Sequence, residues 1–134
     1  MNFVSKPATL NASQKRVFEF LSDFNNFEKL MPDQVSNWKS EKETCSFTIQ
    51  GMTDISLKYS LKQAFHTIKV EPDGKSPINF DLMVNLAVND MDEQKTNGTI
   101  EINASLNPMM AMIAKRPLEN LVEVMIDKLN GVFN

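Results

Sequence analysis

The sequence predicts an α+β fold in which a curved antiparallel sheet of about seven strands grips one long C-terminal helix, with two short helices after the first strand. Two observations carry this prediction. From Leu118 to Val132 the apolar residues recur at the i, i+3, i+4 and i+7 spacing of one helical face. From Cys45 to Leu106 apolar and polar residues alternate, as in strands with one buried and one hydrated face. The helix must bury its apolar stripe, and the sheet is its natural partner.

Length and composition bound the class of protein. The chain has 134 residues and no linker, repeat or low-complexity segment, so we expect a single domain over residues 1–134. A net charge of -3 with dispersed lysines disfavours nucleic-acid binding. The single cysteine, Cys45, excludes an internal disulfide. No signal peptide or run of membrane-spanning length is present, so we expect a cytoplasmic protein without an integral membrane segment.

The first thirty residues predict a strand and two short helices. Phe3 to Leu10 suits a strand, and the proline inside it restricts the strand to a sheet edge. Asn11 or Ser13 can cap a first helix, because a short polar side chain satisfies the free N–H groups of the first turn. A second helix, Phe24 to Met31, should end at Pro32.

From Val35 onward the hydrophobic period is two, and turn-forming residues separate the alternating runs. Gly51 and the Pro72-Asp73-Gly74 group predict two of the turns, and either Asn97-Gly98 or residues 90–93 form the last hairpin. Hairpin connections this short make the sheet antiparallel. After the N-terminal strand, the expected strands are one around Trp38 and those at residues 45–49, 55–61, 66–70, 80–88 and 100–106.

The C-terminal helix begins with an unusual stretch. Proline cannot donate to the helical ladder and clashes one turn back, so Pro117 predicts a break or kink at residues 114–116. Met109, Met110 and Met112 precede it, and flexible thioether side chains adapt to guests of variable shape. We therefore hypothesise a methionine-rich gate hinged at the proline. Ordinary filling of the core is the alternative.

Few residues could carry chemistry. His66 is the only histidine, and without an orienting partner we interpret it as a structural or strand-end residue rather than a catalytic base. Tyr59 is either a core ring bonded to the backbone or a hydrogen-bond donor to a ligand. Cys45 has no flanking base and is expected to be inert. The sequence shows no metal-ligand spacing and no phosphate-binding loop, so we expect no metal or cofactor.

Two segments resemble a known superfamily. Ser22-Asp23-Phe24, continued to Pro32, looks like the helical corner of the START-like, or polyketide cyclase and lipid-transport (SRPBCC), superfamily. Leu106-Asn107-Pro108 looks like the entry to its gripped helix. The resemblance implies the helix-grip fold, with an elongated apolar cavity between sheet and helix. Members include lipid and sterol carriers, aromatases and cyclases, coenzyme Q-binding proteins and a ribosome-association group.

Three functions remain open. We favour non-enzymatic binding or transport of a hydrophobic small molecule, such as a lipid, quinone or polyketide, with Tyr59 and His66 orienting its polar end. The alternatives are a polyketide cyclase or aromatase, which needs polar groups inside the cavity, and a protein-interaction module of the ribosome-association type, which would use the acidic face of the final helix. The expected ligand-binding residues are Phe47, Ile49, Tyr59, His66, Phe80, Leu82, Met110, Leu118, Val122 and Met125.

Overall fold

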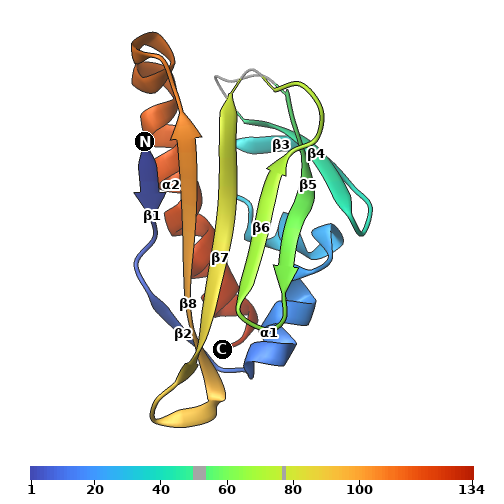
Figure 1. Cartoon of the computed structure of the whole chain (residues 1–134), viewed down its shortest axis with the longest axis vertical. Helices are drawn as coiled ribbons and strands as arrows, with labels where there is room; N and C mark the ends of the chain where they lie inside the picture. Colours follow the sequence, from blue (N-terminus) through green and yellow to red (C-terminus); the bar gives the residue numbers. More distant parts are fainter. Residues whose placement is uncertain (50–53, 77) are drawn as a thin grey trace.

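A computed structural model describes residues 1–49, 54–76 and 78–134. In these ranges the chain forms eight strands, two α-helices and one 3-10 helix (Figure 1). The elements follow in the order β1 (Asn2–Val4), β2 (Ala8–Leu10), α1 (Gln14–Leu21), η1 (Phe24–Leu30), β3 (Val35–Ser40), β4 (Thr44–Ile49), β5 (Asp54–Gln63), β6 (Thr67–Pro72), β7 (Asn79–Asn89), β8 (Asp92–Ser105) and α2 (Pro108–Val132).

The strands form one curved antiparallel sheet in the order β1-β8-β7-β6-β5-β4-β3, and β2 also pairs with β8. The long helix α2 packs against β8 and against η1, and α1 packs against β7 and β8 (Figure 1). The α+β architecture predicted from the sequence is therefore confirmed. The apolar faces of the sheet and the helices form one continuous core.

The N-terminal segment is two strands rather than the single strand expected over Phe3 to Leu10. The division falls at Ser5, which exchanges hydrogen bonds with Ile100 of β8. Its backbone N–H donates to the Ile100 carbonyl at 2.8 Å, and its hydroxyl oxygen accepts the Ile100 N–H at 3.0 Å. Pro7 then interrupts pairing because it has no N–H to donate. This split raises the strand count from the expected seven to eight.

Both short helices are present. Ser13, rather than Asn11, caps α1, because its hydroxyl oxygen accepts the N–H of Arg16 at 3.3 Å. Asp23 caps η1 by accepting the N–H of Asn25 at 2.9 Å. The second helix is of the 3-10 type and ends at Leu30, one residue before the Met31 end that the sequence predicted, because the residue before Pro32 is disfavoured in a helix.

The turns resolve the choices that the sequence left open. β7 and β8 are joined at Asp90 and Met91, so the acidic segment makes the hairpin and Asn97-Gly98 lies inside β8. β6 ends at Pro72, and Gly74 has a φ of +84°, which favours glycine. Gly51 lies outside the described residues.

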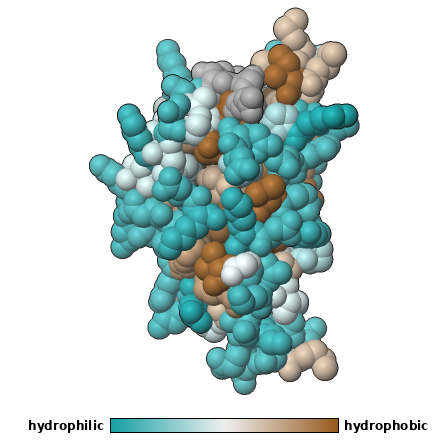
Figure 2. Space-filling model, turned by 180° about the vertical axis from the view of Figure 1, so that it is seen from behind, coloured by the Kyte–Doolittle hydropathy of each residue, from teal (hydrophilic) through white to brown (hydrophobic). Residues whose placement is uncertain are grey.

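The helix α2 runs without interruption through Pro117, so the break expected at residues 114–116 is absent, and the alternative of a kink there stays a prediction. The proline leaves the carbonyl of Ile113 without its usual helical donor, in a residue that is half exposed to solvent. Most of the predicted apolar stripe is confirmed, since Leu118, Leu121, Val122, Met125 and Leu129 are buried. Its last member, Val132, is 40% exposed at the end of the helix, and Ile126 is buried in addition. The surface seen from behind is mostly hydrophilic, apart from scattered hydrophobic residues and a projecting hydrophobic end at the upper right (Figure 2).

Candidate functional site

An enclosed apolar cavity of about 20 Å³ lies where α2 and η1 meet the sheet. Every described residue that lines it is apolar, so no described side chain places a polar group in its wall. The lining residues are Phe27, Met31, Phe47, Ile49, Ile55, Leu57, Ile78, Phe80, Leu82, Leu118, Leu121 and Met125.

The sheet contributes to the cavity through strict alternation. In β4 and β5, Phe47 faces Ile55 across the strand pair, and both point to the helix side of the sheet. In α2, Leu118, Leu121 and Met125 recur at i, i+3 and i+7 and form one stripe. The cavity is the space that remains where these two apolar surfaces meet.

The helical corner closes one side of the cavity. Phe27 in η1 and Met31, which follows η1, both line it. Lys128 of α2 donates from its ammonium group to the Met31 carbonyl at 2.6 Å, and this bond holds the corner against the C-terminal half of the helix. An ammonium-to-carbonyl bond is charge-assisted and is stronger than an ordinary neutral hydrogen bond.

The cavity brings together part of the predicted set. The residues that line it as expected are Phe47, Ile49, Phe80, Leu82, Leu118 and Met125. The predicted set lacked Ile55 and Leu57, although their alternation with polar residues in β5 indicates that they share one face of the strand. Ile78 and Leu121 also line the cavity and were not in the predicted set. It also missed Phe27 and Met31, because the helical corner carries no pattern that indicates which sheet face it covers. Their role in binding stays a prediction.

Tyr59 does not line the cavity. Its hydroxyl donates to the Leu21 carbonyl at 2.6 Å, and its ring stacks on Phe24 with a centroid distance of 4.2 Å. Burial raises the pKa of the Tyr59 hydroxyl above its ordinary value, and the nearby carboxylates of Glu43 and Asp23 act in the same direction. The structure therefore places Tyr59 as a core ring bonded to the backbone, the first of the two interpretations above.

His66, Met110 and Val122 also lie away from the cavity. His66 was expected to orient the polar end of a guest, but it is exposed in the turn before β6 and does not line the cavity. The chain reverses over residues 64–66, and the alternation begins only at Thr67. Met110 is half-buried in the first turn of α2. Val122 is buried beside Phe3 of β1, because its position on α2 faces the N-terminal strand.

Cys45 lies on the buried face of β4 and is a free thiol. Burial raises the pKa of this thiol to about 12, although a backbone hydrogen bond to Leu57 acts in the opposite direction. The thiol therefore stays protonated at neutral pH, which agrees with the inert role expected from the sequence.

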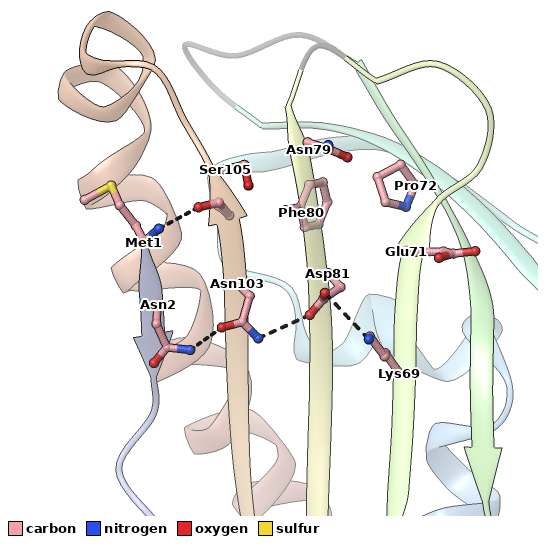
Figure 3. Close-up of a pocket in the computed structure, with 11 residues that line it drawn as sticks. Met1, Asn2, Lys69, Glu71, Pro72, Asn79, Phe80, Asp81, Asn103 and Ser105 are labelled. Carbon is pink, nitrogen blue, oxygen red and sulfur yellow. Dashed lines mark hydrogen bonds and ion pairs between the residues drawn. The ribbon is translucent and has the colours of Figure 1, made fainter.

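A larger depression of about 570 Å³ opens on the outer face of the sheet, away from α2 (Figure 3). Four of its polar side chains pair with one another across the strands. Asn2 donates to Asn103, Asn103 donates to Asp81 at 3.3 Å, and Lys69 lies 3.8 Å from Asp81 (Figure 3). Because these four groups bond to one another and the depression is open to solvent, we regard it as a weaker candidate site than the enclosed cavity.

The described residues contain no group of three or more histidine, cysteine or acidic residues placed to hold a metal ion. None of the helices in the described ranges is long and apolar enough to cross a membrane.

No protein-family model and no curated protein matches this sequence. Solved structures do match. A START superfamily protein from Mycobacterium smegmatis is 13% identical, with a TM-score of 0.67 over 98% of this chain and 96% of that chain. Norcoclaurine synthase from Thalictrum flavum, a point mutant in complex with a transition state analogue, is 12% identical, with a TM-score of 0.72 over 99% and 94%. The solution structure of KanY protein is 11% identical, with a TM-score of 0.74 over 99% and 97%.

The chain has the helix-grip fold, the fold of START-like proteins. At sequence identities this low, the structural similarity establishes the fold alone. The ligand and the reaction have to be argued from the site.

Proposed function

We propose that this chain binds a hydrophobic small molecule, such as a lipid, quinone or polyketide, between the sheet and α2 without catalysing a reaction on it. The observation that carries the proposal is the enclosed cavity, whose described lining is apolar throughout. Apolar walls favour an apolar guest because binding removes both surfaces from water.

Binding requires the cavity to expand. A volume of about 20 Å³ holds about one water molecule, whereas pockets for drug-sized ligands span about 300–1,000 Å³. Met31 and Met125 line the cavity, and their unbranched side chains can change rotamer at small cost. Expansion therefore begins with side chains that already face the cavity.

The first half of α2, residues 108–117, is held less firmly than the second half, and we expect the cavity to open on the side of the first half. Over residues 108–117 only Ala114 is buried, whereas the second half carries the rest of the buried stripe. The second half is also tied down, because the Lys6 ammonium lies 2.8 Å from the carboxylate of Asp127 and the Lys6 N–H donates to Glu123 at 3.0 Å. We expect the first half to move away from the sheet, as the gate hypothesis requires.

The structure favours binding over the two alternatives. A cyclase or aromatase needs polar groups aimed at its substrate, and the described lining residues carry none, while the Tyr59 hydroxyl is already bonded to Leu21. An interaction module would use the acidic face of α2, which consists of Glu119, Glu123 and Asp127, and two of these three carboxylates already bind Lys6.

Native mass spectrometry of the protein purified from its own host tests the proposal. We expect one bound apolar molecule for each chain, released by organic extraction and identified by its mass. A protein that is purified empty, and that takes up no member of a panel of fatty acids, quinones and aromatic polyketides, would overturn the proposal.

A further inference from the structure

The first two turns of α2 expose large apolar side chains. Met109 is 73% exposed, Met112 is 88% exposed and Ile113 is 50% exposed. Their i, i+3, i+4 spacing places them on one face of the helix, directed away from the core. The start of α2 forms the upper left end of the molecule in Figure 1, and this end projects at the upper right of Figure 2, where hydrophobic colours gather. We call residues 108–116 the α2 tip.

The charge of the α2 tip differs from that of the whole chain. Residues 108–116 contain no acidic residue and end in Lys115 and Arg116, both exposed, whereas the chain has a net charge of -3. Arg116 lies four residues from Met112 and three from Ile113, so its guanidinium group adjoins the apolar face. The next acidic residue, Glu119, comes one turn later. The tip therefore joins a protruding apolar face to a local positive charge.

We propose that the α2 tip docks on an anionic lipid bilayer. Met109, Met112 and Ile113 would enter the boundary between headgroups and acyl chains, where apolar side chains gain from leaving water. Lys115 and Arg116 would lie at the level of the lipid phosphates, which attract basic residues next to an inserted apolar face. A projecting end that carries flexible methionines suits a deformable lipid surface, whereas a protein partner requires a fitted hollow.

Docking at this position has a geometric consequence for the cavity. Leu118, the first α2 residue that lines the cavity, follows Arg116 by only two positions. A docked tip would thus hold the opening half of α2 at the bilayer surface. The docking itself needs no guest in the cavity, so it stands or falls separately from the proposed function.

Vesicle co-sedimentation of the full chain tests the proposal. We expect the protein to sediment with vesicles of phosphatidylcholine mixed with phosphatidylserine, to bind vesicles of phosphatidylcholine alone more weakly, and to be released by salt. The double variant Lys115→Glu/Arg116→Glu should lower the partition coefficient by more than tenfold, since one basic residue at an anionic surface contributes about fivefold. Met112→Asp should lower it as well.

Matched variants keep the test specific to the tip. Met91 is 93% exposed in the turn between β7 and β8, so Met91→Asp makes the same chemical change elsewhere and should leave sedimentation unchanged. Lys15→Glu/Lys42→Glu changes the net charge by the same amount at exposed positions outside the tip and should also have little effect.

Three outcomes would overturn the proposal. The first is a wild-type protein that does not sediment with anionic vesicles, or that binds both vesicle types equally. The second is a loss of binding in the Met91→Asp or Lys15→Glu/Lys42→Glu controls as large as the loss in the tip variants. The third is a dimer in sedimentation velocity that Met112→Asp dissociates while vesicle binding is absent, which would make the tip a protein contact.

Discussion

Truncation of Leu118 tests whether the cavity is the place where the fold accepts a guest. Leu118 is 2% exposed and lines the cavity from α2. Leu118→Ala removes three buried carbon atoms, a transfer cost of about 2.4 kcal/mol at about 0.8 kcal/mol each. The new hole merges with the existing cavity of about 20 Å³ and resists local collapse. The free energy of unfolding should therefore fall by about 3–4 kcal/mol in total, as is usual when a buried leucine is replaced by alanine.

Urea unfolding and binding of a fluorescent hydrophobic probe measure the two consequences. Leu129→Ala is the matched control, because Leu129 is fully buried on the same helix and does not line the cavity. We expect Leu118→Ala to bind the probe several-fold more tightly than wild type and Leu129→Ala to bind it unchanged. A stability loss below about 2 kcal/mol for Leu118→Ala would show that the site collapses. An equal gain of probe binding in both variants would also refute the reasoning.

Two further measurements test other parts of the argument. Hydrogen exchange should show the amides of residues 109–115 less protected than those of residues 121–129, because only Ala114 anchors the first segment; equal protection would contradict the gate. The free energy of unfolding should fall as the pH rises from 9.0 towards about 12, because the folded chain keeps the Cys45 proton that the unfolded chain releases above 9.0. Cys45→Ala should make this fall less steep in urea titrations at stepped pH, and an unchanged slope would place the thiol in a more hydrated site than the structure shows.

The architecture was predictable because its signals are periodic. The stripe from Leu118 to Leu129 and the alternation of Phe47 and Ile49 are local patterns, and each one names the buried face of its own element. Elements with one apolar face have few ways to cover one another, so the sheet-and-helix arrangement followed.

The site was harder to predict because it depends on how elements meet. His66 was expected to begin a strand, but β6 begins one residue later, at Thr67, and His66 lies in the preceding turn. Val122 and Leu121 are neighbours on the same helix, yet a rotation of about 100° separates them, so one packs towards β1 and the other lines the cavity. The volume of the cavity depends on the interlocking of side chains from five elements, which no single stretch of sequence records.

The position of β8 has a consequence for the order in which the chain folds. β1 and β2 leave the ribosome before β3 to β8, yet both pair with β8, and Asn2 pairs with Asn103, about a hundred residues later in the chain. Until β8 is synthesised, the first ten residues have no strand partner, and closing so long a loop is slow. Phe3 and Leu10, which are buried in the folded chain, therefore lack their β8 partner until that strand is synthesised, and in this interval chaperones and neighbouring chains compete for them.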